Sequence, residues 1–440
     1  MPSRTLILIA LLVVATRVCW AADSDPEFKE AKAAFLREMK KKAPAARAEA
    51  ILALAEVARP ESAELILKRG LTDTDPQVRL AVRKGLRKLV DERPTRMFLF
   101  DEYKKSLRKT GANDSVAELL RALVCTDDEE LQRELVKSLD EHLTAPKSNI
   151  LLPMTLIDDF GQQGDADAAR AVKLMSGAKV FEGKFGYRRC VVQAMCRIRE
   201  PDAVSFLVEL TPKVEGLIQH DVVDYLTRLT RKKFRDNSRE WNNWWKANKA
   251  AFTFPAPDAI AAAEPLETNL PAYYGLPICA KRVVFVLDTS ASMRGQPMEL
   301  AKQALVKVVE SLPESVAFDI VMFDQSATAW QPRLIPATDA NKLDASRTVM
   351  ARGMKVGTAS HGALTATFGL EPEAIYFLSD GEPTDGQPSQ IVNSITAMNR
   401  TQRVSIHTIG VVTDRGGGIG LTRFMQPLAQ QNYGNFQLVQ

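Results

Sequence analysis

The C-terminal part of this 440-residue chain takes its fold from the run Val283-Val284-Phe285-Val286-Leu287-Asp288-Thr289-Ser290-Ala291-Ser292. Its first five residues are β-branched, aromatic or aliphatic without polar alternation, which is typical of a parallel strand covered on both faces. The sequence that follows alternates between helical stretches and further apolar runs. We expect strands at 317–323, 374–378, 404–409 and 435–439, with helices at 299–309, 391–398 and 421–430. This alternation predicts an α/β domain with a doubly wound parallel sheet.

Small oxygen-bearing side chains stand where these strands end. Asp288, Ser290 and Ser292 follow the first strand, Asp380 follows the 374–378 strand, and Thr358 opens a helical stretch between them. Doubly wound sheets bind ligands beyond the carboxyl ends of their strands. Hard oxygen donors without a Cys or His cluster suit Mg²⁺, Mn²⁺ or Ca²⁺. The plainer alternative is that these residues only cap helices and form turns.

Asp288-x-Ser290-x-Ser292, together with Thr358 and Asp380, resembles the metal-ion-dependent adhesion site of von Willebrand factor type A domains. The resemblance covers residues 281–440 and implies a Rossmann-like fold. It also implies direct metal contacts from the three hydroxyls, contacts largely through water from the two carboxylates, and a partner's acidic side chain that completes the metal shell. One departure is that Ala359 and Ser360 follow the threonine where Asn is common.

The chain upstream of this domain has a helical pattern from 28 to 252. Asp75-Pro76-Gln77-Val78-Arg79 combines a capping residue, a proline that suits the first helical turn and the start of an apolar face. This opening resembles HEAT repeats, and comparable arginines recur at 47, 79, 133 and 189. Residues 23–250 are therefore predicted to form a HEAT-like α-solenoid, with an irregular helical bundle as the alternative. Residues 251–280 hold five prolines and are predicted to be a linker.

The first 22 residues have the layout of a secretory signal peptide. Arg4 precedes ten apolar residues at 6–15, and small residues follow. Because no later stretch is long and apolar enough to span a bilayer, we expect an exported chain: periplasmic, cell-surface or extracellular. With this segment, the chain resembles a secreted protein of bacterial type.

The charge balance gives no indication of a nucleic-acid partner. The chain has 58 Lys and Arg against 54 Asp and Glu, a formal charge of +4. Removal of Arg4 and Arg17 with the signal peptide would leave +2. An excess this small over a chain of this length leaves no electrostatic footprint for a polyanion.

The cysteines are too few for a disulfide scaffold, since the chain has five. Cys190 and Cys196 point to different faces of one expected helix and cannot bridge each other. Cys279 is either free or paired with Cys125, Cys190 or Cys196, and the sequence favours none of these options.

These features predict a secreted, non-enzymatic binding or adhesion protein. Its type A domain would bind a divalent cation and, through it, an acidic side chain of a protein partner. A second hypothesis is a scaffold that binds partners through the helical repeats, with the metal only stabilising the fold. A metal-dependent hydrolase is the third, although no Gly-x-Ser-x-Gly elbow follows a strand. No catalytic residue is predicted.

Overall fold

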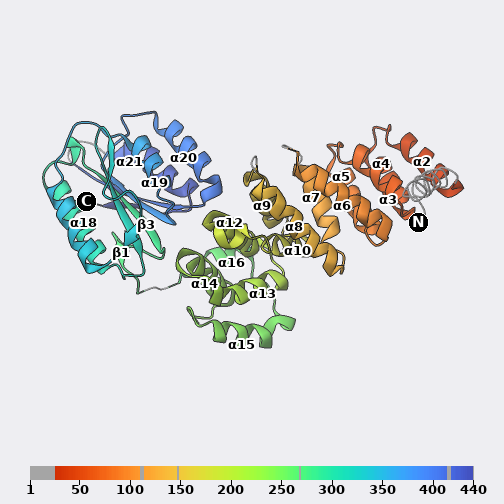
Figure 1. Ribbon diagram of the computed structural model, residues 1–440, viewed down its shortest axis with the longest axis horizontal. Helices are drawn as coiled ribbons and strands as arrows, with labels where there is room; N and C mark the ends of the chain where they lie inside the picture. Colours follow the sequence, from red (N-terminus) through yellow and green to blue (C-terminus); the bar gives the residue numbers. More distant parts are fainter. Residues whose placement is uncertain (1–24, 110–112, 146–147, 267–268, 414–417, 440) are drawn as a thin grey trace, which may run out of the picture. The chain divides into compact units, whose positions relative to one another are not determined.

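The computed structural model describes residues 25–109, 113–145, 148–266, 269–413 and 418–439 (Figure 1). The predicted signal peptide at 1–22 lies outside these residues. The chain divides into two compact units, one with the residues before 153 and residues 166–178, the other with residues 153–165 and everything from 179 onward. No helix in the described ranges combines the length and the apolar character needed to cross a membrane.

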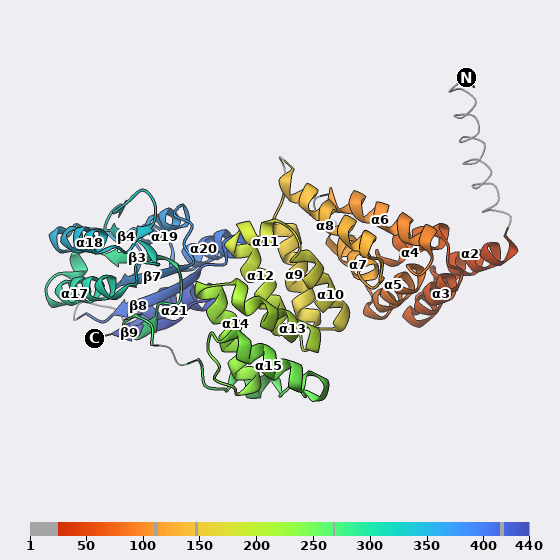
Figure 2. The ribbon, with the colours of Figure 1, turned by 60° about the horizontal axis from the view of Figure 1, so that its bottom comes forward.

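The first unit is entirely helical. Its helices are α2 (Pro26–Glu38), α3 (Pro44–Glu56), α4 (Pro60–Gly70), α5 (Pro76–Leu89), α6 (Arg93–Leu107), α7 (Asn113–Leu123), α8 (Glu129–Thr144) and α10 (Ala166–Met175). Helix α3 packs on α5 and α5 on α7, while α4 packs on α6 and α6 on α8. Figure 2 shows the resulting two layers, in which each helix lies beside the one two places further along the chain. This is the stacking expected of helical pairs that cannot bury their apolar faces alone. The assignment to HEAT repeats stays a prediction.

The helix starts agree with the sequence signals. The Asp75 carboxylate accepts a hydrogen bond from the Gln77 amide and caps α5, while Pro76 takes the first helical position. The Asp128 carboxylate caps α8 in the same way through the Leu131 amide. Each cap satisfies a backbone donor that the helix itself leaves free.

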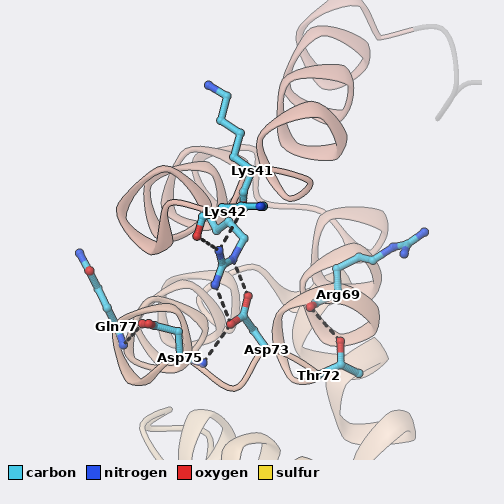
Figure 3. Close-up of polar contacts among 8 residues, drawn as sticks. Lys41, Lys42, Arg69, Thr72, Asp73, Asp75 and Gln77 are labelled. Atoms are coloured by element: carbon cyan, nitrogen blue, oxygen red, sulfur yellow. Dashed lines mark hydrogen bonds and ion pairs between the residues drawn. The ribbon is translucent and has the colours of Figure 1, made fainter.

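One arginine ties neighbouring helical pairs together. The Arg47 guanidinium on α3 makes two hydrogen bonds to Asp73 in the turn before α5, at 2.7 and 3.0 Å, and also donates to the carbonyls of Lys41 and Lys42 (Figure 3). These bonds from Arg47 lower the pKa of Asp73. Arg79 on α5 forms the equivalent ion pair with Asp114 on α7, at a more exposed position. Arg47 and Arg79 thus connect one helical pair to the next, whereas Arg133 donates to the Glu129 carbonyl within its own helix.

The second unit combines helices with the predicted sheet. Its helical part consists of α9 (Leu151–Gln163, from residue 153), α11 (Val180–Gly183), α12 (Phe185–Arg197), α13 (Pro201–Leu210), η1 (Thr211–Lys213), α14 (Gly216–Thr230), α15 (Ser238–Asn248), η2 (Lys249–Ala251) and α16 (Pro257–Ala261). Trp241 and Trp245 of α15 are buried, and the Trp245 indole donates to Ser205 on α13. These buried side chains therefore pack α15 against α13.

The sheet domain follows the strand–helix alternation of the sequence. Its strands are β3 (Arg282–Asp288), β4 (Ala317–Phe323), β5 (Ala327–Ala329), β6 (Ile335–Pro336), β7 (Ala374–Ser379), β8 (Ser405–Val411) and β9 (Phe436–Val439). The order is β5-β4-β3-β7-β8-β9, with β6 beside β4. The central strands are parallel, and β5 and β6 are short antiparallel additions at one edge. The prediction of a helical region followed by a doubly wound α/β domain is confirmed.

Both faces of the sheet are covered. The helices of this domain are η3 (Ala291–Met293), α17 (Gln296–Ser311), α18 (Asp339–Ala351), α19 (Ser360–Phe368), α20 (Pro388–Gln402) and α21 (Gly418–Gln431). Apolar residues of α17 and α18 join one core, and those of α19, α20 and α21 join the other. Strand β3 contributes alternate side chains to the two cores, which explains its unbroken apolar run.

The segment between α16 and β3 also joins the core under α17. It forms a small hairpin of β1 (Ala272–Tyr273) and β2 (Leu276–Pro277). Tyr273, Leu276 and Ile278 are buried in the core under α17. Cys279 is a free, half-buried thiol. The Pro-rich segment is thus partly built into the sheet domain, while the predicted domain boundaries stay a prediction.

The amino ends of the strands hold helices of the same unit. Arg403, just before β8, is buried, and its guanidinium donates to Asp158 on α9 and to Gln193 on α12. In return the Arg189 guanidinium donates to the Arg403 carbonyl. Gly186 allows this approach, since a Cβ there would lie 2.0 Å from the Thr401 carbonyl oxygen. The helices α9 and α12 are therefore bound to the sheet domain through its amino-terminal edge.

We predict that Arg47→Ala increases local opening of α3 and α5 in the first unit more than Arg79→Ala does. Loss of Arg47 leaves the carboxylate of Asp73 without its charged partner in a half-buried turn, whereas Arg79 and Asp114 are more exposed. Amide hydrogen exchange in α3 and α5 should accelerate about tenfold in Arg47→Ala and change little in Arg79→Ala. Equal exchange rates in the two variants would contradict a special role for Arg47.

A second prediction concerns Asp319, which lies fully buried in β4. Its Oδ1 accepts the Gln331 amide at 2.9 Å, whereas Oδ2 has no hydrogen-bond partner among the described residues. Burial raises the pKa of Asp319 to about 7. The folded state therefore holds a proton that the unfolded state releases near pH 4. The stability that this group contributes is complete below about pH 4 and is lost as the pH rises to about 7.

Asp319→Asn removes this titration. The unfolding free energy of the variant, relative to that of the wild type, should rise by about 4 kcal/mol between pH 4 and 8, as measured by urea denaturation. Asp324→Asn is the control, because Asp324 is equally buried but paired with Arg352 at 2.9 Å. That variant should be less stable than the wild type throughout this range. A constant difference between wild type and Asp319→Asn would refute the prediction.

Candidate functional site

The carboxyl ends of β3 and β7 lie next to each other, because Leu287 pairs with Leu378 in the parallel ladder. The residues that follow these two strands therefore meet at one edge of the sheet. Asp288 ends β3 and is fully buried, and Asp380 directly follows β7 and is 3% exposed. The two carboxylates predicted from the sequence are thus brought together.

A continuous chain of hydrogen bonds joins four of the five predicted residues. The Ser290 amide donates to Asp288 Oδ1, and the hydroxyls of Ser290 and Ser292 lie 2.8 Å apart. The Ser292 hydroxyl donates to Asp380 Oδ1, also at 2.8 Å. Asp288, Ser290 and Asp380 are buried, so the hydrogen bonds join two buried acids through the exposed hydroxyl of Ser292.

Thr358 reaches the same edge through the loop after β7. Its amide donates to the Thr384 hydroxyl at 2.9 Å, and the Thr384 amide donates back to the Thr358 carbonyl at 2.9 Å. Gly357 precedes it with φ +103°, and a Cβ there would approach Gln325 to 3.1 Å. The turn that presents Thr358 therefore requires a glycine at this position.

The backbone around the site is braced by the end of β4. The Thr289 amide donates to the Phe323 carbonyl at 2.7 Å, and the Ala359 amide donates to the Asp324 carbonyl at 2.7 Å. Asp324 itself is paired with Arg352. Three strand ends thus fix the loops that carry the predicted site residues.

Burial disfavours the charged form of both carboxylates. Neither Asp288 nor Asp380 forms an ion pair with a cation of the described residues. Burial raises the pKa of Asp288 to about 6, and the nearby Asp380 adds to the effect, while hydrogen bonds from Ser379 and Ser290 oppose it. Burial also raises the pKa of Asp380. Among the described residues, these two buried acids therefore have no cation that balances their negative charge.

Three supporting hydroxyls were not singled out by the sequence. The Ser379 hydroxyl donates to Asp288 Oδ2 at 2.5 Å, and that of Thr413 donates to Asp380 Oδ2 at 3.4 Å. Thr384 holds the Thr358 turn, as described above. Ser379 ends β7 directly before Asp380, which is a signal in the sequence, whereas only the tertiary fold places Thr384 and Thr413 beside the predicted residues. His361 has a different position: its ring Nε2 lies 3.1 Å from the Ser394 hydroxyl on α20.

Comparison with known proteins agrees with this fold. A family model for the von Willebrand factor type A domain matches residues 281–438. The chain is similar to inter-alpha-trypsin inhibitor heavy chain H1 of Sus scrofa, with 33% identity over 132 residues that cover 26% of this chain and 14% of the relative. Heavy chain H3 of Bos taurus is 42% identical over 76 residues, or 17% of this chain and 8% of the relative. The chain therefore matches only a small part of these much longer proteins.

Among solved structures, a von Willebrand factor type A protein from Catenulispora acidiphila matches with a TM-score of 0.33 and 18% identity, covering 37% of this chain and 39% of that one. Proximal thread matrix protein 1 from the mussel byssus matches with a TM-score of 0.29 and 21% identity over 36% of this chain and 40% of that one. Residues 281–438 are a von Willebrand factor type A domain, on the evidence of the family model and the heavy-chain relatives.

We predict that Ser379→Ala destabilises the sheet domain by about 1–3 kcal/mol in metal-free buffer, because a buried oxygen of Asp288 loses its donor. Urea denaturation in the presence of EDTA measures this change. Ser311→Ala is the matched control, since its hydroxyl bonds only the Val308 carbonyl at the exposed end of α17. Equal stabilities of the two variants would show that the Ser379 bond does not support Asp288.

Proposed function

We propose, with a von Willebrand factor type A domain as the premise, that this chain is an exported, non-enzymatic binding protein. Asp288, Ser290, Ser292, Thr358 and Asp380 would hold a divalent cation, Mg²⁺ or else Mn²⁺ or Ca²⁺. The cation would bind an acidic group of a protein partner. The helical region at 23–250, with its HEAT-like stack, would carry the domain after removal of the signal peptide at 1–22.

The observation that carries this proposal is the pair of buried carboxylates, Asp288 and Asp380, that form no ion pair with a cation in the part of the chain that the structure describes. Burying two acids near each other costs free energy unless a positive charge compensates them. The surrounding groups are hydroxyls, which add oxygen ligands but no charge. A bound divalent cation would balance both carboxylates and explain why the fold tolerates them.

The donor set also fits the chemistry of the cation. Mg²⁺ and Mn²⁺ prefer oxygen ligands, and Mg²⁺ keeps several waters when it binds to proteins. In the described residues no group of three or more His, Cys, Asp or Glu side chains could hold a metal by itself. A site with two carboxylates and three hydroxyls would therefore leave coordination positions to water or to an outside carboxylate. The cation would supply the positive charge, and the protein groups would orient it.

We predict that the wild-type protein binds Mg²⁺ and Mn²⁺ and that Asp380→Ala abolishes this binding in isothermal titration calorimetry. Asp339→Ala is the control, because Asp339 is a fully exposed aspartate on α18. Addition of Mg²⁺ should raise the melting temperature of the wild type and of Asp339→Ala but not that of Asp380→Ala. The absence of metal binding by the wild type would disprove the proposed function.

The role of the partner is tested separately from the metal. Partners captured from the native extract in Mg²⁺ should be released by EDTA and should not bind Asp380→Ala. Partners that stay bound after chelation would instead favour a scaffold that binds through its helical stack. Hydrolysis of a substrate that is lost in Ser290→Ala would overturn the non-enzymatic assignment.

A further inference from the structure

A groove runs from the candidate site along one side of α17. It has a volume of about 690 Å³ and lies between α17, the ends of β8 and β9, and the hairpin residue Tyr274. We call this cavity the α17 groove. Its size is within the range of pockets that bind small ligands or short peptide segments.

The groove is continuous with the candidate site. Ser292 and Thr413 line it, and both of their hydroxyls donate to the Asp380 carboxylate. A molecule that contacted a cation at this edge could therefore extend directly into the groove.

The floor of the groove is apolar and incompletely covered. Val411 is buried, while Tyr274, Ala304 and Val439 are partly buried and pack against the core under α17. Leu300 projects from α17 with 45% of its surface exposed. These side chains would gain from contact with an apolar group of a ligand.

The rim of the groove is positively charged. Arg294 precedes α17 and Lys307 lies in its fourth turn, and both are exposed. Neither forms an ion pair with a described residue, and none of the described residues that line the groove is an Asp or Glu. The side chains of Arg294 and Lys307 can therefore pair with acidic groups of a ligand.

We propose that the α17 groove binds an extended acidic segment of the partner protein. One carboxylate of this segment would bind the cation, an apolar side chain would contact Leu300 and Val411, and a second acid would pair with Arg294 or Lys307. The first of these contacts rests on the proposed function. Between Gln296 and Lys307, a stretch of twelve residues, α17 rises about 16 Å, which an extended peptide spans with about five residues. The preferred segment therefore has two acids about five residues apart with an apolar residue between them.

A random twelve-residue peptide display library, selected on the full protein in Mg²⁺ and eluted with EDTA, tests this proposal. The eluted peptides should share the acid–apolar–acid pattern. Synthetic copies of them are then measured for affinity by fluorescence anisotropy. Mn²⁺ binding by every variant is measured in parallel, so that loss of the metal is not mistaken for loss of the groove.

Arg294→Glu and Lys307→Glu should each weaken peptide binding about tenfold while the protein still binds Mn²⁺. Arg347→Glu, a charge reversal at an exposed position of α18, should leave the affinity unchanged. Leu300→Ala should weaken binding several-fold, whereas Leu343→Ala, which is exposed on α18, should not.

The outcomes separate the groove from the metal site. Peptides whose binding needs Mg²⁺ and Asp380 but is insensitive to Arg294, Lys307 and Leu300 would overturn the groove and leave the proposed function standing. Binding that survives EDTA and Asp380→Ala yet is lost in the groove variants would place recognition in the groove and overturn the metal-dependent contact. Self-association of the protein with the same sensitivity to the groove variants would make a second copy the occupant and overturn an acidic partner.

Discussion

The parallel pairing of β3 with β7 is the constraint on which the candidate site depends. It sets the carboxyl ends of two buried strands next to each other and places Asp288 and Asp380 at the same edge. Two neighbouring buried acids need hydrogen-bond donors, and hydroxyl groups supply them. The Ser379 hydroxyl donates to Asp288, and the Ser292 hydroxyl donates to Asp380. Hydrogen bonds of this kind reduce the cost of burial but cannot cancel the charge. The site is therefore organised around negative charge that the described part of the protein leaves uncompensated.

The strands of the sheet could be predicted because each is an apolar run too short for a helix and bounded by polar residues. The sequence did not reveal β5, β6 or α18. Strands β5 and β6 have three and two residues and depend on β4 for their definition, and α18 buries only Ala345 and Val349. Elements with so little buried surface leave a weak pattern in the sequence. The buried side chains of the Pro-rich segment were not predicted either, because its five prolines indicate a linker. Tyr273, Leu276 and Ile278 of this segment nevertheless join the core under α17.

The candidate site shows a similar division. Asp288, Ser290, Ser292 and Asp380 could be identified because a short motif or a strand end marks each of them, and the structure joins them by hydrogen bonds. Thr413 could not, because its place beside Asp380 follows from the pairing of β8 with β7, which one sequence does not reveal. Thr384 depends likewise on the return of the loop toward Thr358. Local motifs therefore predicted the residues that carry the charge, and the tertiary fold supplied the residues that hold them.

In the second unit, the amino ends and the carboxyl ends of the parallel strands have different surroundings. At the amino ends of the strands, Arg403 contacts α9 and α12, and the Glu373 carboxylate accepts the Lys281 amide beside Gly216 at the start of α14. These contacts bury charged groups against helices of the same unit and hold the sheet domain at that edge. The carboxyl ends carry the hydrogen-bonded acids, and the chain of hydrogen bonds between Asp288 and Asp380 passes through the exposed Ser292. A binding site at the carboxyl edge can therefore face a partner while the opposite edge stays fixed to its helices, as the proposed function requires.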